Sequence, residues 1–420
     1  MNLWRILFTF GTRLGAALLN FGLVWLTARW LGAEGRGQSS LFGIDRTLLL
    51  LFTGLVGGSS LIYLAPRRNL WQLLLPAYGW TTAVSVLGTA AVWWWRRPAA
   101  EYLGYLLAAT LFEAWGVAHL LVLLGRRHER LYNTYTLLQS LGVVLGLVVA
   151  LFALQWRSPS AYYAAYVLTY AVLWLLSGVA LWQQADKPIG HLRRWRSVAR
   201  ELARHSRNAH FSNIVGFANY RLGFYFVAAW VSTGAVGVLS VGVALAEAVW
   251  LIPRSISQVQ YVDTIYHTNP DAPVQATVRA VRLSMVLSAA AVLALALVPA
   301  AWLTAIFGRD FAAAQRIIWA LALGVVAFST HMQLSAYFAG TARYRINNVA
   351  ALLGLALTLG ACVVLIPSYG AVGAAWAATV SYLGSTLWLA WQFAKVTGSK
   401  PTALLPRSAD ARLLAQLMRR

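Results

Sequence analysis

The chain has 420 residues, of which 60% are hydrophobic and only 11% are charged, and its mean hydropathy is +0.63. Soluble proteins are usually about 45–50% apolar, so this composition excludes a soluble globular chain and indicates a polytopic membrane protein. The formal net charge of +22 does not indicate nucleic-acid binding, because the basic residues are scattered through short gaps between apolar runs.

The apolar runs predict about twelve transmembrane helices. A span needs about 20 apolar residues, and backbone groups in lipid must be satisfied within each segment, which requires helices. Reading the runs between charged, proline and glycine breaks places the spans near 3–31, 38–65, 69–95, 101–125, 131–156, 160–184, 207–231, 234–261, 275–304, 312–340, 345–367 and 370–394. The expected fold class is an all-α polytopic membrane protein with two six-helix bundles around a central cavity.

The positive residues predict the orientation of these spans. Most of the 34 lysines and arginines fall in connections on the side that holds the N-terminus. The positive-inside rule therefore predicts that both termini are cytoplasmic, which agrees with an even number of spans.

The widest gap between apolar runs lies at the centre of the chain. Leu192, Trp195, Val198 and Leu202 recur there at helical spacing among arginines, which predicts an amphipathic helix on an anionic leaflet, with anionic membrane lipids as partners. The expected domains are an N-terminal six-helix bundle, a cytoplasmic amphipathic linker, a C-terminal six-helix bundle and a basic cytoplasmic tail, at residues 1–184, 185–206, 207–396 and 397–420.

Short glycine-rich turns recur in the two halves. The tetrapeptide Gly234-Ala235-Val236-Gly237 returns as Gly370-Ala371-Val372-Gly373, and Gly32 to Gly37 occupies the first turn. Small residues let consecutive helices turn tightly and pack closely. Repeated hairpins in paired bundles are common in alternating-access transporters.

Several of these segments resemble the polysaccharide-biosynthesis flippases, a family of the multidrug/oligosaccharidyl-lipid/polysaccharide exporter superfamily. The segments are Ala28-Arg29-Trp30-Leu31-Gly32-Ala33-Glu34-Gly35-Arg36-Gly37, Asn219-Tyr220-Arg221, Val236-Gly237-Val238, Ala246-Glu247, Ile252-Pro253, Phe307-Gly308, Asn347-Asn348 and Leu365-Ile366-Pro367-Ser368-Tyr369-Gly370-Ala371-Val372-Gly373-Ala374-Ala375. One departure is Leu222-Gly223-Phe224, where relatives often carry an acidic residue shortly after the Tyr-Arg pair.

The resemblance implies an alternating-access flippase in the bacterial inner membrane. Its substrate would be an undecaprenyl-diphosphate-linked oligosaccharide for cell-surface polysaccharide assembly, with a polysaccharide polymerase as a further partner. No Walker loop is present, so we expect no ATP hydrolysis, and the lone Cys362 excludes a cysteine metal cluster. We expect no enzymatic activity, no cofactor and no metal.

Six ionisable residues fall inside the predicted spans, where a charge costs about 2.5–3.5 kcal/mol on insertion scales. They are Arg13, Asp45, Arg46, Glu113, Arg221 and Glu247. A guanidinium group presents a planar set of donors that suits phosphate and stays charged in a low-dielectric site. The candidate substrate-binding residues are therefore Arg13, Arg46, Arg221 and Arg254, with Tyr220, Tyr225 and Trp250 as aromatic faces for the sugars.

The intramembrane charges have a second interpretation, in which they cancel in pairs. Arg221 would pair with Glu247, while Asp45 or Glu113 would pair with Arg13 or Arg46. The three acids are thus candidates for coupling or for charge pairing. Arg254 follows Pro253 and either faces the cavity or extends to the cytoplasmic surface.

Two other functions remain open at this stage. A cation-coupled multidrug antiporter of the same superfamily favours an acidic cavity, whereas this chain has three intramembrane arginines against three acids. A polytopic polysaccharide polymerase or glycosyltransferase needs a sizeable outward segment to hold donor and acceptor together, but the outward connections are all short.

Overall fold

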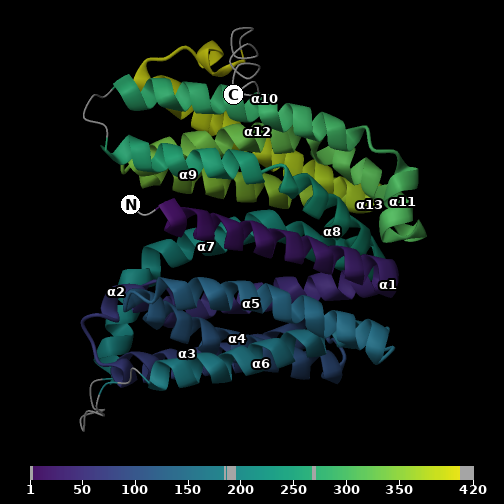
Figure 1. The fold of residues 1–420 in the computed structure, drawn as a ribbon. Helices are drawn as coiled ribbons and strands as arrows, with labels where there is room; N and C mark the ends of the chain where they lie inside the picture. Colours follow the sequence, from purple (N-terminus) through teal and green to yellow (C-terminus); the bar gives the residue numbers. More distant parts are fainter. Residues whose placement is uncertain (1–2, 184–185, 187–194, 267–270, 407–420) are drawn as a thin grey trace. The chain divides into compact units, whose positions relative to one another are not determined.

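The computed structural model describes residues 3–183, 186, 195–266 and 271–406, and the regular elements within these ranges are all helical (Figure 1). The chain divides into two compact units, Met1–Ile214 and Val215–Arg420. The division falls inside one continuous helix, α7 (Trp195–Trp230).

The first unit is built from six main helices and the start of α7, and α3 to α6 run side by side in it (Figure 1). Its elements are α1 (Leu3–Gly57), α2 (Ser60–Leu64), α3 (Leu70–Arg96), α4 (Ala100–Gly125), α5 (Glu129–Val148), the π-helical turn η1 (Val149–Ala153) and α6 (Pro159–Trp182). Local signals set the helix starts: the Asn69 side chain caps α3 by accepting from the Trp71 N–H at 3.0 Å, and Pro159 occupies the first turn of α6.

The core of the first unit contains a cluster of aromatic rings. Phe42 of α1 is fully buried and contacts the rings of four tyrosines, three of them on α6, with centroids 4.4–6.3 Å apart. Such edge and stacked contacts add to the free energy gained by burying the rings. This cluster fixes α6 against α1, and so positions the charged residues that lie next to Phe42 in the sequence.

The second unit contains the rest of α7 and the helices that follow it. These are α8 (Thr233–Ala248), α9 (Leu251–Tyr266), α10 (Asp271–Ala296), α11 (Ala300–Phe307), the 3-10 turn η3 (Arg309–Ala313), α12 (Ala314–Gly340), α13 (Tyr344–Thr397) and the 3-10 turn η4 (Pro401–Leu404). Leu334, Phe338, Leu389 and Phe393 are fully buried where α12 and α13 pack together.

Two glycines break the longest helices. Gly32 in α1 has φ 68° and Gly370 in α13 has φ 57°, and the flanking residues are helical. Left-handed backbone costs an L-residue roughly 1–2 kcal/mol, so glycine is favoured where the chain reverses between spans. Both glycines lie in the turns predicted from the recurring glycine-rich segments.

The observed helices supply the predicted number of about twelve spans. Gly32 and Gly370 each divide one long helix into two, and α8 with α9 forms one span bent by 47°. Among the described residues, and with each glycine-broken helix counted once, seven helices are long and apolar enough to cross a membrane, or eight with the bent pair. Apolar side chains in mid-helix remain exposed, such as Leu168 and Val364, as expected of surfaces that face lipid.

The structure differs from the sequence prediction at two breaks. The span predicted at 234–261 is broken at Val249 and Trp250, because Pro253 has no N–H to bond to the carbonyl four residues earlier. The span predicted at 275–304 ends earlier, at Ala296, and a separate α11 begins after Pro299.

The predicted amphipathic segment also takes a different form. Instead of a separate helix ending near residue 206, α7 continues to Trp230. Val198 and Leu202 are buried in the first unit, against residues of α2, α3 and α4. Leu192 and the Trp195 side chain lie outside the described residues.

Candidate functional site

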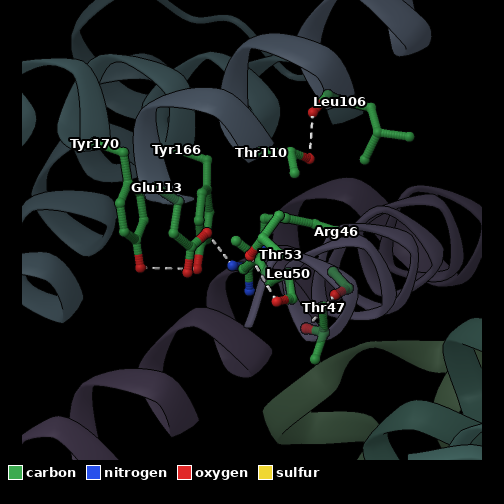
Figure 2. Close-up of polar contacts among 10 residues, drawn as sticks. Arg46, Thr47, Leu50, Thr53, Leu106, Thr110, Glu113, Tyr166 and Tyr170 are labelled. Carbon is green, nitrogen blue, oxygen red and sulfur yellow. Dashed lines mark hydrogen bonds and ion pairs between the residues drawn. The ribbon is translucent and has the colours of Figure 1, made fainter. Parts of the chain in front are cut away.

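In the first unit, Arg46 and Glu113 form an ion pair within the membrane-spanning helices. Arg46 lies on α1 and its Nη1 donates to the Oε2 of Glu113 on α4 (Figure 2). The two side chains are only 12% and 10% exposed. One of the predicted pairings is therefore formed, and the second partner offered for Glu113, Arg13, lies outside the residues whose side chains are described.

Two tyrosines of α6 complete this site. The Arg46 guanidinium carbon lies 4.4 Å from the centroid of the Tyr166 ring, and Tyr166 stacks on Tyr170 with hydroxyl groups 3.3 Å apart (Figure 2). A cation over an aromatic face gains about 0.5–2 kcal/mol, more when it is desolvated. The buried Arg46 Nε has no hydrogen-bond partner among the described residues, so one donor of the guanidinium is unused.

Asp45 has a different partner from those predicted. Arg96, at the end of α3, donates from Nη2 to Asp45 Oδ2 at 2.8 Å, and the Tyr102 hydroxyl donates to the same oxygen at 2.5 Å. Asp45 is almost completely buried, and charge-assisted hydrogen bonds of this kind offset the cost of burying its charge. Of the alternatives predicted for Arg46, the structure therefore forms the pair with Glu113, and Asp45 pairs with Arg96.

In the second unit, Arg221 of α7 and Glu247 of α8 form a bidentate pair. Arg221 Nη1 donates to Glu247 Oε1 and Nη2 donates to Oε2, both at 3.2 Å. The side chains are 31% and 26% exposed, so this pair is more accessible than the Arg46 pair. The pairing predicted from the sequence is observed, and the pair is not sealed in dry packing.

Aromatic rings form a wall beside this pair. Trp250 packs against Phe328 at 4.7 Å and Tyr382 at 5.5 Å, and Tyr220 contacts all three rings. The Trp250 indole N–H donates to the Val325 carbonyl at 3.1 Å, which fixes the ring. Tyr220 is partly exposed. Trp250 is only 4% exposed, and it holds the Tyr220 ring in place by packing against it.

A small enclosed cavity lies among the same helices. Its volume is about 30 Å³, and it is lined by residues of α7, α8, α12 and α13, including Tyr220, Glu247 and Tyr382. That volume corresponds to roughly one water molecule. Asn219 at its edge accepts hydrogen bonds from Thr358 at 2.6 Å and Ser381 at 2.9 Å. Gly223 and Phe224 also line the cavity, and Glu247 supplies the carboxylate among its lining residues.

Two further candidates lie apart from the wall. Tyr225 is 6% exposed and does not line the cavity, so the aromatic role predicted for it has no support in the geometry. Arg254 is exposed on α9, one residue after Pro253, and forms no ion pair with the described residues. Arg254 is thus an accessible positive charge of the second unit.

Sequence reasoning missed Arg96, Tyr166 and Tyr170. Arg96 follows three tryptophans at the end of α3, a pattern typical of a membrane interface rather than of an internal ion pair. The sequence does carry a signal for the tyrosines, because Tyr162, Tyr166 and Tyr170 recur every four residues, which places their rings on one face of a helix. Three polar-tipped rings on one face of an apolar helix indicate a buried polar neighbour.

These features define a polytopic helical membrane protein of two units, each with an ion pair inside its spans. No protein-family model matches the sequence, and no curated protein matches it. Among solved structures, the chain is similar to "Lipid II flippase MurJ, inward closed conformation", with a TM-score of 0.72 at 11% identity over 96% of this chain and 89% of that one.

Two transporter structures are also similar. An inward-facing multidrug resistance MATE family transporter of the MOP superfamily matches with a TM-score of 0.69 at 12% identity, over 92% of this chain and 96% of that chain. A mutant of the Vibrio cholerae MATE transporter VcmN matches with a TM-score of 0.58 at 11% identity, over 95% of this chain and 97% of that chain. The chain therefore has the fold of the MOP-superfamily transporters, as the sequence predicted.

Proposed function

We propose that this protein is an alternating-access flippase that moves an undecaprenyl-diphosphate-linked oligosaccharide across the bacterial inner membrane for cell-surface polysaccharide assembly. Both termini would be cytoplasmic, and a polysaccharide polymerase would consume the translocated product. The observation that carries the proposal is the bidentate Arg221–Glu247 pair, which lies within the spans and is still accessible. The fold shared with a lipid II flippase and with MATE transporters supports a transport function.

The guanidinium of Arg221 suits a diphosphate group. Glu247 already occupies its two terminal nitrogens with a planar, bidentate anion, and a phosphate presents the same geometry. A diphosphate would therefore take over donors that now bind the carboxylate. Arg254, which has no ion pair with the described residues, adds the excess positive charge that an anionic head group needs.

The aromatic wall suits the sugars of the substrate. Tyr220 offers a partly exposed ring beside Arg221, and Trp250 holds that ring from behind. Sugar rings present apolar C–H faces that stack on aromatic side chains and hydroxyl groups that bond to the tyrosine. We assign Tyr220 to substrate contact and Trp250 to positioning, and no substrate role to Tyr225.

In the first unit, the proposed phosphate ligands are Arg46 and Arg13. The unpartnered Nε of Arg46 is a donor that a phosphate oxygen or a bridging water would satisfy. Glu113 balances its charge in the absence of substrate. We assign Asp45 to charge pairing alone, because two donors already hold it.

Exchange at Arg221 also suggests how transport is coupled. When a diphosphate takes Arg221, Glu247 loses its partner, and an isolated carboxylate inside a span is costly. Glu247 would then take up a proton or a cation, and release it when the pair forms again. Substrate binding and ion binding are thus linked through one carboxylate.

A second candidate function is a cation-coupled multidrug antiporter. The observation that favours it is the position of Glu247 beside the aromatic rings of Tyr220, Trp250 and Tyr382, which are groups that bind organic cations. The two candidates differ in the residue that touches substrate: Arg221 for the flippase and Glu247 for the antiporter.

Transport by purified protein in proteoliposomes tests the two candidates. The flippase assay follows a fluorescent undecaprenyl-diphosphate-linked saccharide, and the antiporter assay follows an organic cation. We expect Arg221→Gln to slow lipid flipping roughly 10- to 100-fold, since a charge-assisted hydrogen bond contributes about 1.5–3 kcal/mol. Glu247→Gln should retain binding of the lipid but uncouple it from ion gradients.

The matched control is Arg316→Gln, which removes an exposed arginine of α12 that lies outside the site. Each variant is first checked for a single symmetric peak in gel filtration. Equal flipping rates for Arg221→Gln and Arg316→Gln would overturn the flippase proposal. Movement of the organic cation that depends on Glu247, with no movement of the lipid, would establish the antiporter instead.

A further inference from the structure

A second basic site lies in the first unit, away from the ion pairs described above. The turn between α2 and α3 and the turn between α4 and α5 enclose an open pocket of about 690 Å³. Its polar lining consists of Arg67, Arg68, Asn69, Arg126, Arg127 and Asp186, which together form what we name the basic pocket. Four guanidinium groups and one carboxylate therefore face a shared space.

The Asp186 carboxylate marks the position of an anion in the basic pocket. It accepts a hydrogen bond from the Leu70 N–H at 2.7 Å and another from Arg126 Nη2 at 2.5 Å. Leu70 begins α3, a helix of 27 residues, so this anion lies where the first unsatisfied N–H groups and the helix dipole favour negative charge. The backbone N–H, the guanidinium and the charge are the elements of a phosphate-binding site.

The other arginines are held close to the pocket and leave it with excess positive charge. The Arg67 guanidinium lies 4.0 Å from the centroid of the Tyr63 ring and donates to the Tyr63 carbonyl at 2.9 Å. Arg68 pairs with Glu201 of α7 at 3.0 Å. Arg127 is exposed and forms no ion pair with the described residues. Asp186 and Glu201 therefore neutralise only part of the charge.

The position of the basic pocket in the fold indicates which kind of anion it binds. It lies where α3 begins and α4 ends, at the ends of two predicted spans, and the lipid head groups lie at this depth of a bilayer. The exposed Tyr63 ring beside Arg67 is of the kind enriched at the membrane interface. Basic pockets between helices at this level suit phospholipid head groups.

We propose that the basic pocket binds the phosphate group of an anionic membrane lipid, and that the Asp186 carboxylate occupies the phosphate position when no lipid is bound. Arg126 and the Leu70 N–H are the ligands that lipid and carboxylate share. Arg127 is the ligand that the lipid gains. This site is separate from Arg221 and Glu247, so its failure would leave the proposed transport unaffected.

Native mass spectrometry of the full-length, detergent-purified protein tests this site with phosphatidylglycerol as the probe. We expect Arg126→Gln/Arg127→Gln to weaken lipid binding at least 10-fold. Asp186→Asn should strengthen it severalfold, because it removes the internal competitor and a negative charge. This gain of affinity keeps the test decisive even where the double variant does not fold.

The control variant is Arg157→Gln, an exposed arginine in the connection between α5 and α6, which should bind lipid as the wild type does. Equal affinity of wild type, Asp186→Asn and Arg157→Gln would overturn the proposal. Inorganic phosphate and pyrophosphate are added as competitors. Displacement of the lipid by micromolar phosphate would show a site for the free anion and overturn the lipid assignment.

Discussion

The carboxylate of Glu247 faces the guanidinium of Arg221 through two parallel hydrogen bonds of 3.2 Å, from adjacent helices joined by a two-residue turn. Both side chains keep more than a quarter of their surface accessible. An accessible pair can exchange its anion with little rearrangement of the surrounding helices. Under the proposed function, the Glu247 carboxylate released from Arg221 would then take up a proton or a cation.

The accessibility of the Arg221 pair predicts a small contribution to stability. In a double-mutant cycle with Arg221→Gln and Glu247→Gln, we expect a coupling energy of about 1 kcal/mol or less, because solvent screens accessible charges. The measurement is the unfolding free energy in one detergent. A coupling energy of several kcal/mol would show that the pair is mainly structural.

The Arg46–Glu113 pair should behave differently, because it is more deeply buried. Removing one partner of a buried pair leaves an uncompensated charge and costs about 3–5 kcal/mol. We expect Arg46→Gln and Glu113→Gln each to lower the Tm by more than either change at the Arg221 pair. The double variant should recover part of the loss. Additive losses in the double variant would contradict this pairing.

The breaks at Gly32 and Gly370 predict strain when a side chain is added. Gly370→Ala and Gly32→Ala should each destabilise the protein by about 1–2 kcal/mol, because alanine disfavours positive φ. Gly360→Ala is the matched control, since this residue is helical in the same α13 and an added Cβ meets nothing within 4 Å. It should leave the Tm unchanged or slightly raised. Equal Tm values for all three variants would contradict the predicted strain at Gly32 and Gly370.

The hydrogen bond from the Leu70 N–H to Asp186 predicts how the protection of the Leu70 amide depends on pH. Partial burial raises the pKa of Asp186, but the Leu70 N–H and Arg126 outweigh it and hold that pKa below the usual value. For a lowered pKa, the stabilisation is complete above the unfolded value of about 3.9 and is lost as the pH falls through the folded value. Hydrogen-exchange protection of the Leu70 amide, corrected for the intrinsic rate, should therefore be equal at pH 7 and pH 5.

The Trp71 amide provides the control for this measurement, because it bonds to the Asn69 side chain and not to Asp186. Asp186→Ala should remove the protection at Leu70 and leave that at Trp71 unchanged. Protection at Leu70 that already weakens between pH 7 and pH 5 in the wild type would contradict the lowered pKa.

The sequence by itself determined the fold class and most of the spans. Hydropathy sets which segments enter a membrane, because each span must satisfy its backbone internally, and glycine-rich turns such as the one at Gly370 show where spans reverse. The Arg221–Glu247 pairing was also predictable, since helices joined by a short turn are neighbours. Pro253 breaks the span between α8 and α9, and the hydropathy pattern alone does not show this break.

Only the tertiary structure decided which helices lie side by side, and hence which charges meet. Asp45 pairs with Arg96 and Arg46 pairs with Glu113 across 51 and 67 residues of sequence. Tyr102 comes from α4, which also carries Glu113, and Tyr166 comes from α6. Hydropathy is the same whichever neighbour a span has, so it carries no record of lateral packing. The packed side chains around Phe42 hold α1 and α6 in register, and that register brings each charge to its partner.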